Sequence, residues 1–274
     1  TLDLKLLLED NTFSTDLSLL SIDLTGLSRI EDIKLSGLTM ESSTIKARQE
    51  QYIDFSGSNF RYAQVHADVH NMIFDSASTG DLAKIIQPDG SERKVARSAR
   101  VGVPPLLALM ADKPFDQALL TASNRDLYDP HGSCVAIIVD DARGYVQGDN
   151  DDVVDKMKRI IALPADAVDA KEYALRMSLY QKDQDRIHPL DAKKFIGKPK
   201  SYTEFRDFLQ NFGNQDNSFR EAKAISVSIL ERVGNHVISI KQRHEPARMY
   251  EVLDPNCGFI YCANEKQRDI AVVN

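Results

Sequence analysis

Residues 234–240 read Gly-Asn-His-Val-Ile-Ser-Ile, and residues 249–256 read Met-Tyr-Glu-Val-Leu-Asp-Pro-Asn. Apolar and polar residues alternate in both stretches, which is typical of β-strands. The polar residues from Gln242 to Arg248 lie between them and predict a hairpin loop. Because neighbouring antiparallel strands lie about 4.8 Å apart, we expect His236, at the start of the first strand, to face Asp254, at the end of the second.

A candidate nucleophile lies upstream of this hairpin. Residues 129–134 read Asp-Pro-His-Gly-Ser-Cys and are followed by the apolar run Val135–Val139, so Cys134 is expected at the start of a helix. A helix N-terminus stabilises a thiolate. A cysteine nucleophile also needs a base and a group that orients the base, which His236 and Asp254 can supply. Taken singly, each residue is typical of a structural position, but their order along the chain favours a Cys134–His236–Asp254 triad.

The elements around these residues predict an α+β fold. Residues 151–163 and 165–181 have helical periodicity, and the second segment carries Val168, Leu175 and Leu179 on one helix face. A polar loop is expected over residues 184–201 and a short helix over 202–212. Period-two alternation then predicts an antiparallel sheet. Its expected strands cover residues 224–230, 236–240, 249–253 and 258–261.

The first 76 residues form a β-rich region with its own pattern. Three similar segments, at residues 22–27, 33–38 and 53–60, alternate apolar with polar residues and close on a Thr-Gly or Ser-Gly turn. The region resembles a degenerate pentapeptide-repeat or β-solenoid module, whose rungs bury their apolar sides by stacking. An irregular β-meander remains the alternative. We expect an N-terminal module at 1–76, a polar and basic connector at 77–103, and a catalytic domain at 104–274.

The catalytic domain resembles the papain-like cysteine proteases, and among them the YopT/AvrPphB family of secreted bacterial effector proteases. The matching motifs lie between about residues 104 and 270: Gly132-Ser133-Cys134, His236-Val237 and Asp254-Pro255-Asn256-Cys257-Gly258. The resemblance implies a papain-like fold. Papain-like enzymes place an oxyanion-binding Gln six residues before the Cys, where this chain has Tyr128, so Asn124 becomes the candidate donor together with the Cys134 backbone N–H. The chain also lacks the Trp that often follows the Cys.

Composition excludes several classes of protein. A net charge of −7 without a dense Lys/Arg run argues against nucleic-acid binding, and no stretch is apolar enough to span a membrane. Three cysteines make no disulfide framework, which indicates a reducing compartment. A zinc site built from Cys134, Cys257, Cys262, His236 and His244 is disfavoured because no C-x-x-C spacing occurs, so neither metal nor cofactor is expected. The chain begins with Thr rather than Met, which indicates a fragment or a processed product.

The resemblance implies that the chain is a cysteine protease, secreted by a bacterium into the host-cell cytoplasm, that cleaves a host protein through a thioester intermediate. The same triad also serves glutamine deamidation and acyl transfer, so these reactions remain open. A protein-binding module with an inactive site is the alternative from a different class. The sequence fixes neither the substrate nor the oligomeric state.

Overall fold

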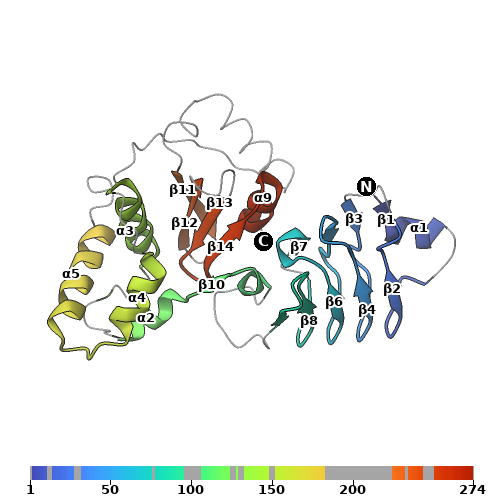
Figure 1. Cartoon of the computed structure of the whole chain (residues 1–274), viewed down its shortest axis with the longest axis horizontal. Coiled ribbons are helices and arrows are strands. Elements are labelled where there is room, and N and C mark those ends of the chain that lie inside the picture. The colour runs from blue at the N-terminus through green and yellow to red at the C-terminus, as the bar shows by residue number, and fades with distance from the viewer. Residues whose placement is uncertain are drawn as a thin grey trace, which may run out of the picture. The chain divides into compact units, whose positions relative to one another are not determined.

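The computed structural model describes residues 2–10, 14–27, 32–75, 78–95, 106–123, 128, 133–147, 152–182, 224–231, 234–242 and 250–273. It shows a mixed helix-and-sheet protein of the α+β class with a β-solenoid-like N-terminal region (Figure 1). The chain divides into two compact units. Unit 1 comprises Thr1–Met110 and Ile270–Asn274, and unit 2 comprises Ala111–Asp269.

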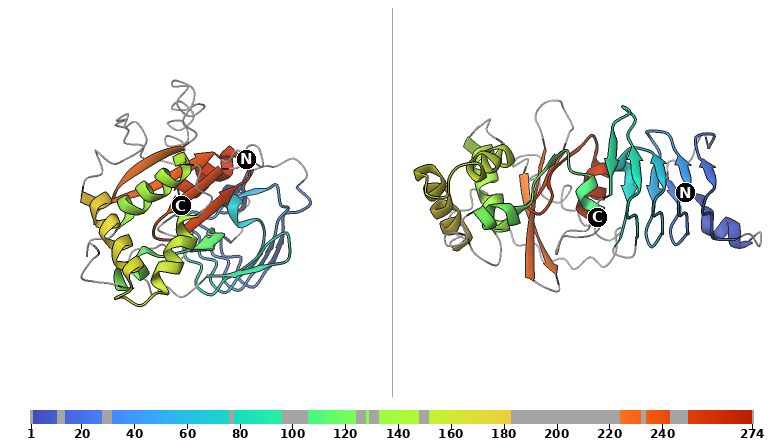
Figure 2. Two further views of the ribbon diagram at one scale, coloured as in Figure 1. Left: turned by 60° about the vertical axis from the view of Figure 1, so that its left-hand side comes forward. Right: turned by 90° about the horizontal axis from the view of Figure 1, so that it is seen from below.

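The solenoid in unit 1 is made of short strands that stack in parallel, as the blue-to-teal part of Figure 2 shows. One sheet contains β1 (Leu2–Asp3), β3 (Asp32–Lys34), β5 (Tyr52–Asp54) and β7 (Met72–Ile73). A second contains β2 (Ser21–Asp23), β4 (Thr44–Lys46), β6 (Gln64–His66), β8 (Lys84–Ile86) and β9 (Glu92–Lys94), with β9 antiparallel to β8. Single parallel bridges at Asp16, Thr39, Asn59 and Thr79 form a further side of the coil. Helix α1 (Leu4–Asp10) follows β1, and a 3₁₀ turn (Val69–Asn71) precedes β7.

A five-residue spacing of inward-facing residues builds the interior of this solenoid. Leu35, Met40 and Ile45 are fully buried, and so are Phe55, Phe60 and Val65 one coil later. Position 35 is followed by position 55 on the same side of the coil, because β3 pairs with β5. The rings of Phe55, Phe60 and Phe74 lie 5.0–6.0 Å apart. Burying aromatic rings in successive coils stabilises the stack.

Strands β8 and β9 extend the solenoid to residue 94, within the segment expected to be a connector. The Gln87–Ser91 turn joins them, since the Gln87 N–H donates to the Ser91 carbonyl and the Gly90 N–H to the Gln87 carbonyl. The charged residues Glu92, Arg93 and Lys94 thus form a hairpin strand rather than an unpaired run. None of the three residues of β9 is buried, so the strand has no apolar–polar alternation and was not predicted from the sequence.

Unit 2 is built on one five-stranded sheet in the order β10-β14-β13-β12-β11, antiparallel throughout. The strands are β10 (Lys113–Pro114), β11 (Ala224–Glu231), β12 (Gly234–Gln242), β13 (Tyr250–Asp254) and β14 (Gly258–Cys262). The four C-terminal strands match the period-two segments of the sequence. Edge strand β10 was not predicted, since a two-residue strand ending in Pro114 carries no alternation.

Helices of unit 2 share one core with a face of the sheet. They are α2 (Gln117–Ser123), α3 (Cys134–Gln147), α4 (Val153–Ile161) and α5 (Val168–Lys182); a 3₁₀ turn (Leu107–Leu109) precedes unit 2, and α9 (Glu265–Val273) follows the sheet. Ile137 and Val139 of α3 pack in the same core as Val237, Leu253 and Phe259 of the sheet. Helix α3 therefore contacts β12, the strand that carries His236, and shares a core with Leu253 of β13, the strand that ends at Asp254. None of the helices in the described part of the chain is long and apolar enough to cross a membrane.

Helix α5 forms where the periodicity predicts it, but the apolar face that revealed it is exposed. Val168, Leu175 and Leu179 are 69%, 61% and 53% exposed. The buried face comprises Ala170, Tyr173, Ala174, Met177 and Tyr180. Two of these buried residues are tyrosines, which an aliphatic pattern does not reveal. The Tyr173 hydroxyl donates to Asp140.

Candidate active site

Cys134 is the first residue of α3, at the helix start that the Pro- and Gly-containing segment predicts. The preceding residue, Ser133, acts as the cap, because its carbonyl accepts the N–H of Ile137 at 2.9 Å. Two glutamines accept further N–H groups at this helix end: Gln117 from Ser133 at 2.8 Å and Gln181 from Ala136 at 3.1 Å. The Cys134 residue itself is 8% exposed.

Asp254 ends β13 and holds the turn that follows it. Its carboxylate accepts the Asn256 N–H at 2.7 Å, and its carbonyl accepts the Cys257 N–H at 3.0 Å. The turn returns the chain to β14 at Gly258, whose φ is +111°. A Cβ at position 258 would lie 2.0 Å from the Lys113 carbonyl oxygen and 2.7 Å from the Phe115 N. Only glycine fits there, which explains the Gly in the Asp-Pro-Asn-X-Gly motif.

Gln117 connects the start of the Cys134 helix with this turn. It begins α2, where Asp116 caps the helix by accepting the Ala118 N–H at 2.9 Å. The Gln117 backbone N–H donates to the Pro255 carbonyl at 2.9 Å. Its side-chain Oε1 accepts the Ser133 N–H at 2.8 Å, and its Nε2 donates to Oδ1 of Asn256. One side chain thus bonds the residue before Cys134 and the second residue after Asp254.

His236 lies at the same end of the sheet by strand register. It pairs with Ile229 of β11. The last paired residues of β12 and β13 are Ser239 and Leu253, and β13 ends one residue later, at Asp254. Strand β12 therefore extends beyond β13, and the backbone of His236 lies in this extension, at the level of the turn after Asp254.

The two strand positions share one face of the sheet. Ser239 and Lys241 bond to Asp141 of α3, so they mark the face that packs on the helix. Because side chains alternate, positions 236, 238 and 240 belong to the other face, and position 254 joins them since Val252 pairs with Ile240. Continuing the register places position 254 opposite 238, which makes 236 its diagonal neighbour. Helix α3, which begins with Cys134, packs on the opposite face.

The other two cysteines are deeply buried. All three cysteines are unbridged. Cys262 is fully buried and Cys257 is 3% exposed. Burial raises the pKa of the Cys257 thiol well above its ordinary value, and the nearby Asp254 charge raises it further. Cys257 therefore remains a neutral thiol, which makes it a poor nucleophile.

Sequence reasoning missed Gln117, which is placed by α2 rather than by the loop just before Cys134. At the expected position, six residues before Cys134, Tyr128 packs in the same core as Ala136 and Ile137. Among the described residues, its hydroxyl has no hydrogen-bond partner. Burial raises the pKa of Tyr128 to about 12, although Arg176 opposes the shift. The predicted donor Asn124 lies outside the described residues, as do the hairpin loop 243–249 and the segment 183–223.

Comparison of the chain with protein-family models, with curated proteins and with solved structures gives no significant match. Fold and site therefore define a class only: an α+β protein with a solenoid-like N-terminal region. In the described ranges, no group of three or more His, Cys, Asp or Glu side chains is arranged to hold a metal ion.

Proposed function

We propose that the chain is a cysteine hydrolase with a papain-like catalytic arrangement, acting on a protein substrate through Cys134, His236 and Asp254. The observation that carries the proposal is the Gln117 side chain, which bonds both the residue before Cys134 and the turn after Asp254. The extension of β12 at the same sheet end adds His236 by register. These residues also match the motifs that resemble the YopT/AvrPphB family.

In the proposed reaction, the Cys134 thiolate attacks a substrate carbonyl carbon after His236 has taken the thiol proton. The scissile C–N bond then breaks, and His236 returns the proton to the leaving amine. Water, deprotonated by His236, hydrolyses the thioester and releases the acid. In this proposal Asp254 orients the His236 ring, and the Cys134 backbone N–H stabilises the oxyanion. In the proposed reaction, the proton passes from Cys134 to His236 around the end of the sheet, where β12 extends beyond β13.

Peptide-bond hydrolysis is the leading reaction, and the resemblance suggests a host-cell protein as substrate of a secreted bacterial effector. Deamidation of a glutamine and acyl transfer use the same acyl-enzyme intermediate. They differ from proteolysis in which amide enters the site and which nucleophile resolves the thioester.

The test is the rate of alkylation of each cysteine by iodoacetamide, measured by mass spectrometry between pH 5 and 9. We expect Cys134 to react at least about tenfold faster than Cys257 and Cys262 at pH 6–7, because only a thiolate reacts and a histidine partner favours it. His236→Ala should remove this low-pH reactivity, and Cys134→Ala should fold normally. Preferential labelling of Cys257 or Cys262, or a Cys134 rate that rises only near pH 8–9, as for an ordinary thiol, would refute the proposed function.

A second candidate function is protein binding by the solenoid. Leu19, Ser42, Tyr62 and Leu82 occupy equivalent corner positions of successive coils and all have positive φ. The three apolar residues are 80%, 56% and 39% exposed, and Ser42 separates Leu19 from the other two. Exposed apolar side chains that lie close together are typical of binding surfaces. Turnover and partner binding measured side by side in the Cys134→Ala variant separate the two functions, because a hydrolase loses turnover in that variant whereas a protein that only binds retains all its activity.

A further inference from the structure

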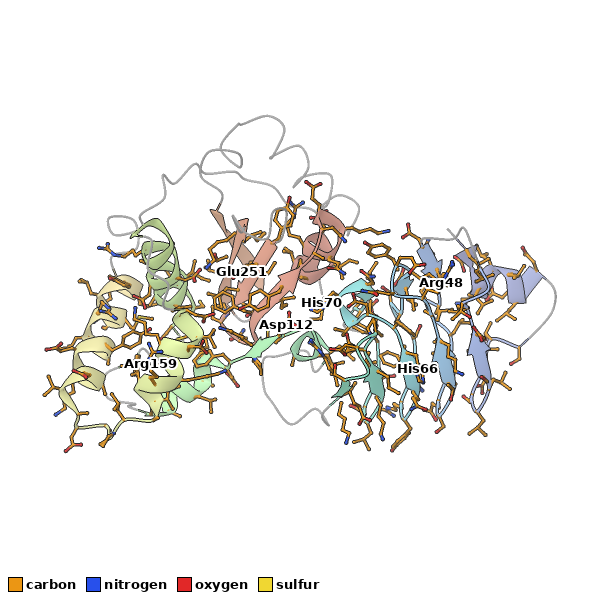
Figure 3. All side chains as sticks on the ribbon, in the orientation of Figure 1. Arg48, His66, His70, Asp112, Arg159 and Glu251 are labelled. Atoms are coloured by element: carbon orange, nitrogen blue, oxygen red, sulfur yellow. The ribbon has the colours of Figure 1, made fainter. Side chains whose placement is uncertain are left out.

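A buried cluster of three charged side chains joins α3 to the central strands of unit 2. The Lys241 ammonium lies 2.7 Å from Oδ1 of Asp141 and 2.8 Å from Oε1 of Glu251. The three side chains are only 5–11% exposed. Ser239 adds a hydroxyl that donates to Asp141 at 3.4 Å. Figure 3 labels Glu251 on the sheet.

Each member of this cluster shares an element with one residue of the proposed triad. Asp141 lies two turns after Cys134 in α3. Lys241 and His236 both belong to β12, and Glu251 and Asp254 both belong to β13. Lys241 and Glu251 are direct cross-strand partners. The cluster therefore fixes three elements relative to one another at a distance from the site itself.

The energetics of buried charge make this contact specific for one helix position. Burial raises the pKa of Asp141, although the Lys241 charge opposes the rise. Burial alone would lower the pKa of Lys241, but the attraction of Asp141 and Glu251 outweighs it and the pKa is raised. A shift of α3 by one residue would move Asp141 by about 1.5 Å and turn it by roughly 100°, leaving a buried charge without its partner. A buried charge that loses its partner is strongly destabilising, so other positions of α3 are disfavoured.

The neighbouring residue, Asp140, provides an internal comparison. Its side chain is also 5% exposed, and it accepts the Tyr173 hydroxyl at 3.1 Å. It lies 3.0 Å from the Lys156 ammonium and 3.7 Å from Nε of Arg176. Asp140 thus fastens α3 to α4 and α5, whereas Asp141 fastens the same helix to the sheet.

We propose that Asp141, Lys241 and Glu251 are positioning residues that set the Cys134 helix in register with the strands of His236 and Asp254. This inference rests on the proposed function. Asp141 acts through the placement of α3 and touches no reacting atom. Its loss should therefore change the chemistry of Cys134 more than its effect on stability explains.

The test compares Asp141→Asn with Asp140→Asn in the full-length chain. Both changes keep the side-chain shape and remove one buried charge from α3, and Lys241 keeps Glu251 as its partner. We expect both variants to melt at lower temperature. Only Asp141→Asn should slow iodoacetamide alkylation of Cys134 at pH 6–7, by about tenfold or more, because small misplacements of reacting groups have large effects on rate. Its rate should then follow the pH profile of an ordinary thiol.

Equal effects of the two variants on Cys134, or no effect of either, would show that the cluster is merely structural. A double-mutant cycle of Asp141→Asn and Lys241→Gln in thermal unfolding tests the ion pair without reference to function. Additive shifts in melting temperature would overturn the cluster itself. Non-additive shifts in a parent protein whose Cys134 shows no enhanced reactivity would refute the proposed function and leave the ion pair intact.

Discussion

At the scale of single residues, Gln117 links the start of the Cys134 helix to the turn after Asp254. Its side chain uses both ends, as acceptor for Ser133 and as donor to Asn256. Gln181 has a simpler role, because its Oε1 accepts the Ala136 N–H in the first turn of the same helix. Both glutamines are half-buried, so the pair separates helix capping from connection to the Asp254 turn.

We predict that Gln117→Ala lowers both stability and Cys134 reactivity, whereas Gln181→Ala lowers stability alone. Each change removes an acceptor at the start of α3, which costs about 1–3 kcal/mol. Only Gln117→Ala also removes a side-chain hydrogen bond to the turn after Asp254, although the backbone bond to Pro255 remains. Thermal melting and the alkylation rate of Cys134 measure the two effects. A reactivity loss of the same size in Gln181→Ala would show that capping explains everything.

The residues most accessible to sequence reasoning were those with a local signal. Pro130 and Gly132 before an apolar run predicted the helix start at Cys134, and α3 begins there. Gln117 carried no such signal, since its role depends on where α2 lies relative to the turn. The triad itself remains a prediction that the iodoacetamide experiment tests.

At the scale of elements, the solenoid shows why its coil length was hard to recognise. The sequence similarity of residues 22–27 and 33–38 suggested successive rungs. However, β2 and β3 lie in different sheets, on two sides of the coil. Equivalent positions are instead Ile33 and Ile53, which pair directly. The five-residue spacing is obscured because buried positions accept Leu, Met, Ile, Phe and Val alike.

The turn between β13 and β14 gives a prediction at this scale. Gly258→Ala should destabilise unit 2 by about 3 kcal/mol or more, because the new methyl group would overlap the backbone of β10 as well as require a positive φ. Gly90→Ala is the matched control. Gly90 also has a positive φ, +83°, but no atom lies within 4 Å of its Cβ position. That change should cost only about 1 kcal/mol.

Chemical unfolding of the two variants, followed by circular dichroism, measures these costs. Equal losses would mean that backbone conformation alone accounts for the glycine, and that the close approach of β10 contributes nothing. The Asp-Pro-Asn-X-Gly segment would then need no neighbouring strand to explain its last residue.

At the scale of the whole molecule, each unit has its own apolar core. The solenoid interior contains stacked phenylalanines, and the core of unit 2 lies between its helices and its sheet. The sequence predicted two parts because the periodicity changes, but it could not locate the end of the solenoid. That end depends on the pairing of β9 with β8, and the sequence of β9 has no apolar–polar alternation that would predict a strand.

Two cores predict two unfolding transitions. Met40 in the solenoid and Met157 in α4 are both fully buried, so Met40→Ala and Met157→Ala make the same chemical change in different units. Each should cost about 2–5 kcal/mol in its own unit through lost contacts and the cavity left behind. In differential scanning calorimetry, Met40→Ala should lower the transition of unit 1 by several degrees and leave the other in place, and Met157→Ala should do the converse. A single transition that both variants lower equally would show that the units unfold together, and the solenoid would then be an integral part of the fold that carries Cys134.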